Sequence, residues 1–471
     1  MERTYGMRYW MTVLALLSAL WVSPAPLTAD RRVTGSAQTY GPTPSFGRES
    51  AADLRQTADT TALRDTLRST GTARPGRLAR TAGQERHPDF AGPKRRRLQH
   101  RLGAEFRPEY IFPTNPFLDG VNSLMRPMDL SLAAHLKYSF QFRPGSYADR
   151  IYGGVYQGIG AAYYNFANPL ELGNPVAIYL FQGARIARLS PRLSLNYEWN
   201  FGLSFGWKPY DRENNALNTM MGSRLNALLN VSFYLRWMLT HELDLTFGPT
   251  LTHFSNGNTT IPNAGLNSAG LQAGLTCNFG RTAAEARVAR RIDGPDFRPH
   301  MTYDLVLFGS WRRKGVAFDG NQYASPDAYT VLGVNFAAMY NFGYKFRAGL
   351  SLDGIYDGSA NVYTEDYIVG YDGGDPGYQF HTPSFDKQIA LGISGRAEFV
   401  MPYFTVGFGL GFNVLHKGGD LKSFYQMLTL KVGVTHNTFV HVGYCLKDFQ
   451  TPNYLMLGVG FRFNNKYPRL R

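Results

Sequence analysis

Long stretches of the chain alternate between apolar and polar residues, and this alternation constrains the fold more than any other feature. From Arg192 to Trp207, the odd positions are all Leu, Tyr, Trp or Phe, and the even positions are polar or Gly. Ser131 to Arg143 and Arg224 to Trp237 behave similarly. A period of two puts apolar side chains on one face of a β-strand and polar side chains on the other. These segments run about 13 to 16 residues, beyond the roughly 5 or 6 of a usual soluble strand.

Strands of this length with one apolar face suit an outer-membrane barrel, in which only every second residue must face lipid. We therefore expect an all-β fold, a transmembrane antiparallel β-barrel of about 12 to 16 strands. Trp207 and Trp237, at strand ends, are expected in the interfacial aromatic girdles. A mean hydropathy of -0.27 is too polar for a bundle of membrane helices. The polar stretch from Arg281 to Pro299 is either a long turn of one barrel, which we favour, or a seam between two smaller barrels.

The chain before the strands divides into two parts. Residues 1–29 have basic residues followed by an apolar core, and this predicts a secretory signal peptide cleaved after Ala29 rather than Ala25. Residues 30–103 are rich in Arg and carry much of the net charge of +14, with too few apolar residues to fold. We interpret them as a disordered basic linker, with contact to lipid phosphates, peptidoglycan or a partner as the alternative. An exported chain has no nucleic acid partner.

Residues 104–471 are expected to form the barrel, and 104–280 contain the stretch that carries chemistry. In the hairpin from His241 to Phe279, His253 and Ser255 share the apolar face of the first strand. Asn267 lies on the same face of the returning strand, at the same end. Polar residues on a lipid-facing wall cost free energy, which indicates a function. The alternative is that these three residues are ordinary polar residues of the membrane interface.

These side chains have the parts of a nucleophilic triad. The His253 imidazole can take the hydroxyl proton of Ser255, and the Asn267 carbonyl oxygen can hold the other ring N–H. An oxyanion hole can come from backbone N–H groups around Asn256 and Gly257, or from the Asn263 amide. The outward leucines Leu251, Leu271 and Leu275 are expected to form a groove for an acyl chain. If this hairpin begins with the seventh strand, the site lies at the outer-leaflet level.

The segment HFSNGNTTIPNAGLNS resembles the motif of outer-membrane lipid A 3-O-deacylases, the acyloxyacyl hydrolase-like barrels. The resemblance extends over most of the stretch from Ala104 to Phe279. It implies that His253 is the base, that Ser255 is the nucleophile, and that Asn256 and Asn263 contribute to the oxyanion hole. It also implies that the substrate is the lipid A of lipopolysaccharide in the outer membrane.

Two departures from that family leave alternatives open. The acid of the family is Asn267 here, and the chain is far longer than the compact eight-stranded type. Asn267 is similar to the triad Asn of outer-membrane phospholipase A, a larger, calcium-using dimeric barrel, so a phospholipid is the alternative substrate. A channel or transport barrel is the non-enzymatic alternative, because sixteen strands can enclose an aqueous lumen that inward residues such as Arg396 and Glu398 would line. A purely structural or adhesion barrel is the third reading.

No cofactor is expected, because no Cys/His metal spacing, phosphate-binding Gly loop or nucleotide fingerprint occurs. A group of acidic loop residues could bind calcium, although a solvated outer loop is the simpler interpretation. These residues are Glu365, Asp366, Asp372 and Asp375. The cysteines Cys277 and Cys445 are predicted on opposite faces of their strands, which argues against a disulfide. The oligomeric state stays open.

Overall fold

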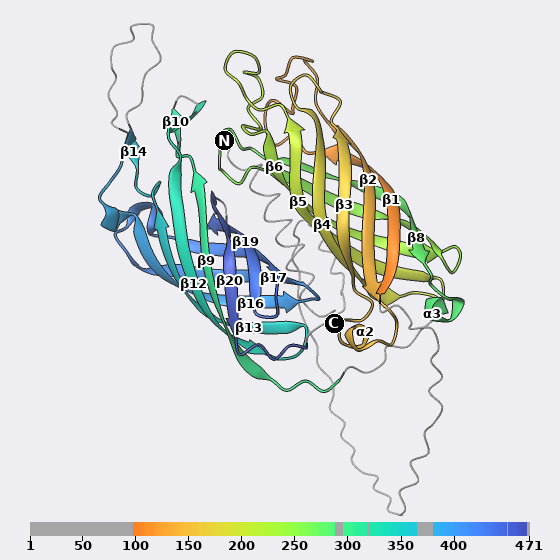
Figure 1. Cartoon of the computed structure of the whole chain (residues 1–471). Helices are drawn as coiled ribbons and strands as arrows, with labels where there is room; N and C mark the ends of the chain where they lie inside the picture. The colour runs from red at the N-terminus through yellow and green to blue at the C-terminus, as the bar shows by residue number, and fades with distance from the viewer. Residues whose placement is uncertain (1–97, 288–294, 319–320, 365–379, 450, 469–471) are drawn as a thin grey trace, which may run out of the picture. The chain divides into compact units, whose positions relative to one another are not determined.

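The computed structural model describes residues 98–287, 295–318, 321–364, 380–449 and 451–468, which form two closed antiparallel β-barrels (Figure 1). The predicted signal peptide and nearly all of the predicted linker lie outside these residues. Among the described residues, no helix is both long and apolar enough to cross a membrane.

The first barrel has eight strands in sequence order, and β1 pairs with β8 to close it. Its strands are β1 (Leu98–Ile111), β2 (Leu130–Phe142), β3 (Tyr156–Asn165), β4 (Gly173–Arg188), β5 (Leu193–Trp207), β6 (Leu225–Met238), β7 (Leu243–Ser255) and β8 (Leu266–Phe279). Two short helices flank the strands, α2 (Tyr147–Tyr152) between β2 and β3, and α3 (Ala283–Arg287) after β8.

The second barrel also has eight strands and is closed by the pairing of β9 with β20. Its strands are β9 (His300–Arg312), β12 (Tyr329–Asn341), β13 (Phe346–Asp357), β16 (Ile389–Val400), β17 (Phe404–His416), β18 (Phe424–Gly433), β19 (Thr438–Lys447) and β20 (Thr451–Phe463). Its loops contain the short pairs β10 (Gly315–Phe318) with β11 (Asn321–Ala324) and β14 (Tyr363–Thr364) with β15 (Phe380–His381), and the 3-10 turns η1 (Phe385–Lys387) and η2 (Gly419–Leu421).

The single barrel that we favoured is therefore wrong, and the stretch from Arg281 to Pro299 joins two barrels. Alternation along a strand sets which face is apolar but not which strand lies beside it. Here the edge of β8 pairs with β1, with Ala104 opposite Leu275, so the first sheet closes before β9 begins. The predicted start of the barrel at Ala104 is also too late, because β1 begins at Leu98. The inward polar residues Gln99 and Arg101 made this part of the strand resemble the basic linker.

The predicted two-faced strands are confirmed, with one exception at the end of β5. Trp237 is 53% exposed on the outer wall, as expected of a girdle residue. Trp207 is only 3% exposed and faces the interior instead. Gly206 has a φ of +93°, and this left-handed residue breaks the alternation immediately before Trp207. Trp207 therefore belongs to the interior of the barrel and not to a girdle.

Buried ion pairs occupy the interior of both barrels. In the first, Lys137 lies 2.5 Å from both Glu105 and Glu198. In the second, Lys431 lies 2.8 Å from Asp304 and 2.7 Å from Glu398. An eight-stranded barrel is just wide enough for side chains to fill it. The sixteen-stranded lumen on which the channel hypothesis depended is therefore not formed.

In each barrel, most connections at one end are long and most at the other end are short, and this defines two ends. The long-loop end of the first barrel carries residues 112–129, 166–172, 208–224 and 256–265. Its short-turn end carries residues 189–192 and 239–242, together with residues 143–155, a longer connection that contains α2. The second barrel has its short turns at residues 342–345, 401–403 and 434–437. In both barrels the first strand begins and the last strand finishes at the short-turn end.

Candidate active site

The predicted site residues lie on the hairpin of β7 and β8, at the long-loop end of the first barrel. His253 and Asn267 are directly opposite each other in the register of the two strands. His253, Ser255 and Asn267 are all partly exposed on the outer wall, whereas the neighbouring Thr252 is buried on the interior face. The alternation of the strands thus places the three polar side chains on one face of one hairpin.

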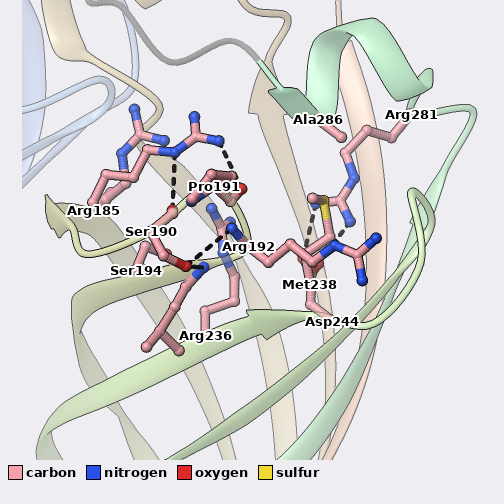
Figure 2. Close-up of a pocket in the computed structure, with 12 residues that line it drawn as sticks. Arg185, Ser190, Pro191, Arg192, Ser194, Arg236, Met238, Asp244, Arg281 and Ala286 are labelled. Atoms are coloured by element: carbon pink, nitrogen blue, oxygen red, sulfur yellow. Dashed lines mark hydrogen bonds and ion pairs between the residues drawn. The ribbon is translucent and has the colours of Figure 1, made fainter.

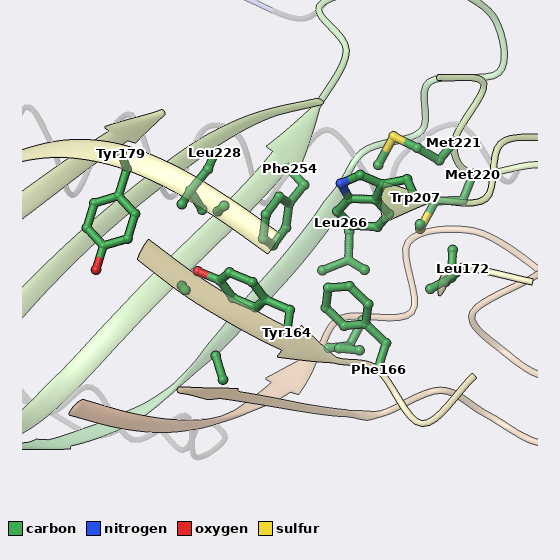
Figure 3. Close-up of a cluster of buried hydrophobic side chains, with 14 of the residues drawn as sticks. Tyr164, Phe166, Leu172, Tyr179, Trp207, Met220, Met221, Leu228, Phe254 and Leu266 are labelled. Atoms are coloured by element: carbon green, nitrogen blue, oxygen red, sulfur yellow. The ribbon is translucent and has the colours of Figure 1, made fainter. Parts of the chain in front are cut away.

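Phe254 anchors this stretch of β7 to the interior of the barrel. The side chain is fully buried in a cluster of aromatic residues (Figure 3). The centroid of its ring lies 4.9 Å from that of Tyr164, 5.1 Å from that of Trp207 and 6.0 Å from that of Phe166. Edge-to-face contacts at these distances are favourable for aromatic rings. Because Phe254 points inward and is held firmly, its neighbours His253 and Ser255 must point outward.

A hydrogen bond between His253 and Asn267 orients the imidazole. The His253 Nδ1 and Asn267 Oδ1 atoms are 2.7 Å apart. An amide oxygen can only accept, so the ring carries its proton on Nδ1. The other nitrogen, Nε2, is then unprotonated and can accept a proton, as a general base must.

Two N–H donors converge on the hydroxyl oxygen of Ser255. The backbone N–H of Gly257 donates to Ser255 Oγ at 3.0 Å, and the Asn263 amide nitrogen donates to the same atom at 3.1 Å. The hydroxyl can itself donate to Asn263 Oδ1 at 3.2 Å. Gly257 has a φ of +66°, a conformation that a residue with a side chain rarely adopts. Donors placed here can stabilise negative charge that develops on an ester bound at Ser255.

Asn256 donates hydrogen bonds to its own loop and not to Ser255. Its backbone N–H donates to Asn263 Oδ1 at 3.1 Å, and its side-chain nitrogen donates to Thr260 Oγ1 at 2.9 Å. The residue is 5% exposed and braces the loop from within. Of the three predicted oxyanion residues, the structure brings Gly257 and Asn263 to Ser255, whereas Asn256 holds Asn263 in position.

The loop between β5 and β6 supports the site, and sequence reasoning missed this contact. Met221 forms a β-bridge with Asn263, the backbone N–H of Gly222 donates to Pro262, and that of Ala264 donates to Met220. Met220, Met221 and Gly222 are 33 to 35 positions from Ser255 and belong to a loop without a recognisable motif, so no signal marked them. Gly265 also adjoins the site, because a Cβ at this position would lie 3.0 Å from the His253 ring.

An apolar surface adjoins the site on the outer wall. Leu271 and Leu275 on β8 are 46% and 47% exposed, and Leu251 on β7 is partly exposed. These leucines lie on the same outer wall as His253 and Asn267, and the groove for an acyl chain stays a prediction.

No metal site accompanies these residues in the part of the chain that the structure describes, where no group of three or more His, Cys, Asp or Glu is placed to hold an ion. The acidic loop residues proposed for calcium, from Glu365 to Asp375, lie outside that part. Cys277 and Cys445 are both free thiols, so the prediction of no disulfide is confirmed.

The closed sheets, the apolar outer walls and the alternation of long and short connections define an outer-membrane β-barrel protein. Residues 133–276 match the family model of lipid A 3-O-deacylase (PagL), and residues 301–465 match that of the acyloxyacyl hydrolase C-terminal domain. The two matches, one in each barrel, support the assignment of the chain to the lipid A 3-O-deacylase family of outer-membrane hydrolases. No curated protein matches the sequence.

Several solved outer-membrane barrels are similar in structure. Neisserial surface protein A is 13% identical, with 39% of this chain and 96% of that chain covered and a TM-score of 0.24. The siderophore receptor PirA from Pseudomonas aeruginosa is 8% identical, with coverage of 78% and 80% and a TM-score of 0.23. Omp33 from Acinetobacter baumannii is 9% identical, with coverage of 78% and 99% and a TM-score of 0.15. The function is therefore argued from the family and the site.

Proposed function

We propose that this protein removes an ester-linked 3-hydroxyacyl chain from lipid A, with Ser255 as nucleophile, His253 as base and Asn267 as the residue that orients the base. The observation that carries the proposal is the arrangement of the three side chains on the outer wall. Asn267 accepts the Nδ1 proton of His253, and two N–H donors face Ser255 Oγ two residues along the same strand.

The chemistry follows from this arrangement. His253 Nε2 takes the hydroxyl proton as Ser255 Oγ bonds to the ester carbonyl carbon, and the resulting oxyanion is stabilised by the Gly257 N–H and the Asn263 amide. The C–O bond to the sugar then breaks, and His253 returns the proton to the sugar oxygen. Water, deprotonated by His253, next attacks the acyl-enzyme and releases a fatty acid, and Ser255 regains its proton. No cofactor takes part in these steps.

The position of the site supports a lipid substrate. The polar residues lie at the end of a wall that is otherwise apolar, so an ester at the membrane interface can meet Ser255 while its acyl chain remains among leucines. Leu271 and Leu275 provide that apolar contact along β8. The match of residues 133–276 to the lipid A 3-O-deacylase model supports lipid A as the source of the ester.

Phospholipase A activity is the second candidate, and one observation favours it. The residue that holds His253 is an amide, Asn267, as in outer-membrane phospholipase A, and not the carboxylate of the deacylase motif. An amide fixes the tautomer but does not balance the positive charge of the imidazolium as a carboxylate does. On this reading, calcium would supply charge stabilisation that the protein lacks.

Purified protein offered lipid A and phosphatidylethanolamine separately, each with calcium and with a chelator, tests both candidates. We expect release of a 3-hydroxy fatty acid from lipid A that is unaffected by the chelator and absent in Ser255→Ala. Calcium-dependent formation of lysophospholipid, with lipid A intact, would overturn the proposal in favour of the phospholipase. Ion conductance in planar bilayers without hydrolysis of either lipid would instead support a channel.

A further inference from the structure

One buried carboxylate lies on the inner face of the first barrel, behind the hydrolytic site. Glu109 is on β1 and is only 2% exposed. One of its carboxylate oxygens, Oε1, accepts the hydroxyl proton of Thr252 on β7 at 2.8 Å. The other, Oε2, accepts the hydroxyl proton of Ser268 on β8 at 2.5 Å. A single side chain therefore joins three neighbouring strands of the barrel wall.

Thr252 and Ser268 are the chain neighbours of the two residues that form the hydrogen bond between His253 and Asn267. The two hydroxyl residues are directly opposite each other in the register of β7 and β8, as are His253 and Asn267. Successive side chains of a strand point to opposite faces of the sheet. The hydroxyl groups point into the barrel, where the two residues are 4% and 2% exposed, and the imidazole and the amide point outward. Glu109 thus binds the inner side of the backbone that carries the outer hydrogen bond.

The strand ends that carry the site are joined to the rest of the wall by incomplete ladders. Two residue pairs are missing from the described pairing of β7 with β6, between Phe247 and Thr250. Pro249 lies in this gap, and proline has no backbone N–H to donate to a neighbouring strand. The pairing of β1 with β8 has a similar gap at Pro108, directly before Glu109. Side-chain contacts beyond these gaps therefore contribute more to holding the strands at a fixed spacing.

Beyond its gap, β1 approaches β8 closely at the level of the site. The backbone N–H of Phe112 donates to the carbonyl oxygen of Asn267 at 2.9 Å. Glu109 is opposite Gly270 in the register, and a Cβ at Gly270 would lie 2.5 Å from the Cα atom of Glu109. This approach requires a glycine. The first strand therefore contacts the site hairpin through its backbone as well as through the carboxylate.

We propose that Glu109 is a positioning residue for hydrolysis, because its carboxylate holds the ends of β7 and β8 at the spacing that the hydrogen bond between His253 and Asn267 requires. The Nδ1 and Oδ1 atoms are 2.7 Å apart, and a shift of about 0.5 Å would weaken the bond between them. A ring that loses this partner no longer carries its proton on Nδ1 alone, so Nε2 is the base in only a fraction of the molecules. The inference rests on the proposed function, in which His253 is the base.

Two substitutions of Glu109 test this role in the full chain. Glu109→Gln keeps both contacts, because the amide oxygen accepts one hydroxyl proton and the amide nitrogen donates to the other hydroxyl oxygen. Glu109→Ala leaves Thr252 and Ser268 without their shared acceptor. We expect kcat for ester cleavage to fall about 5-fold to 10-fold in Glu109→Ala with KM unchanged, and to stay within about twofold in Glu109→Gln. The loss is limited because the Asn267 amide is still present.

Asp244 provides the matched control, because it is a second inward carboxylate that links β7 to β8. It accepts the Nδ2 donor of Asn278 on β8 at 2.9 Å. The terminal nitrogens of Arg281 lie 2.6 and 2.9 Å from its two oxygens (Figure 2). Asp244 lies eight residues before Thr252, about 26 Å along the strand, at the short-turn end. Asp244→Ala should therefore lower the stability of the barrel, as Glu109→Ala does, but keep kcat within about twofold.

The orientation of the His253 ring can also be measured without a substrate. Nitrogen-15 spectra of histidine in the full chain, in detergent micelles, distinguish a ring protonated on Nδ1 from one protonated on Nε2, and His253→Gln identifies the signal. We expect the Nδ1–H form alone in the unmodified chain, in Glu109→Gln and in Asp244→Ala, and a mixture of both forms in Glu109→Ala. If the unmodified chain cleaves no lipid ester, the proposed function fails, but the spectra still test the positioning role.

Three results would overturn the inference: an unchanged kcat in Glu109→Ala, an equal loss of kcat in Glu109→Gln or Asp244→Ala, or a ring that keeps its proton on Nδ1 in Glu109→Ala. Should Glu109→Ala not fold, Ser268→Ala takes its place, since it removes one of the two hydrogen bonds and keeps the carboxylate. A fall in kcat of about 2-fold to 3-fold, together with a mixture of the two ring forms, then supports the inference. An unchanged kcat and an unchanged ring in Ser268→Ala overturn it.

Discussion

Lys137 bridges Glu105 and Glu198 inside the first barrel, and Lys431 bridges Asp304 and Glu398 inside the second. The two barrels therefore have similar ion pairs in their interiors, but their outer walls differ. The first barrel carries His253, Ser255 and Asn267 at its long-loop end, whereas no histidine between 300 and 465 is followed two residues later by a serine. His441, on the last hairpin of the second barrel, faces inward and is 1% exposed. Both barrels have a charged interior, which is a feature of the fold. The chemistry depends on the outer wall of the first barrel alone.

The largest effect is expected from Ser255→Ala, which removes the nucleophile. Ester cleavage should fall at least about 1,000-fold, since loss of a triad member removes most of the catalysis. A histidine on the second barrel, His416, gives the matched control, and His416→Ala should stay within about twofold, as expected for a surface substitution. Fatty acid release by the two variants is measured by mass spectrometry. Near-normal activity of Ser255→Ala would rule out the proposed mechanism.

The shared interiors predict similar losses of stability in the two barrels. Lys137→Met and Lys431→Met should each destabilise their own barrel by about 1.5–3 kcal/mol, the cost of a lost charge-assisted hydrogen bond. The two carboxylates of each network lose one cation but keep a second, Arg107 in the first barrel and Arg347 in the second. Unfolding in urea, followed by the change in gel migration on heating, measures this loss. If only one substitution destabilises the protein, the two networks do not have equivalent roles.

A smaller effect is expected from Asn267→Ala. It removes one hydrogen bond to His253 but leaves the nucleophile and base, so activity should fall about 10-fold to 30-fold. Asn267→Asp keeps the acceptor and adds a charge that stabilises the imidazolium, so it should retain more activity than Asn267→Ala. The kcat values of the two variants provide the comparison. Equal values for the two variants would show that the acceptor at this position does not act through His253.

The smallest effect is expected from deletion of the second barrel. Because β1 pairs with β8, a chain ending after Arg287 should form a closed barrel, and its activity should stay within about twofold of that of the full chain. Activity per folded molecule, with gel migration as the measure of folding, tests this expectation. A large loss would show that the second barrel takes part in hydrolysis.

The sequence predicted the strands and the site hairpin because both depend on local alternation. His253, Ser255 and Asn267 share a face as a direct result of the period of two and the register of one hairpin. Closure into two barrels depends on the pairing of β1 with β8, about 170 residues apart, and alternation contains no information on that choice.

The orientation of Trp207 and the contacts of Asn256 also have local physical causes. Trp207 faces inward because Gly206 adopts a left-handed conformation, which the composition of the strand did not reveal. The backbone N–H of Asn256 donates to Asn263 and not to Ser255, a contact that the sequence did not indicate, and its predicted oxyanion role stays a prediction.

Both barrels begin and finish at their short-turn ends, and this has a consequence for how such a chain can arise and be assembled. The last strand of the first barrel ends, and the first strand of the second begins, at a short-turn end, and each sheet closes on its own strands. Each barrel can therefore be inserted as a complete cylinder, before or after its neighbour. A gene for one eight-stranded barrel could therefore gain a second in tandem without any rearrangement of the first.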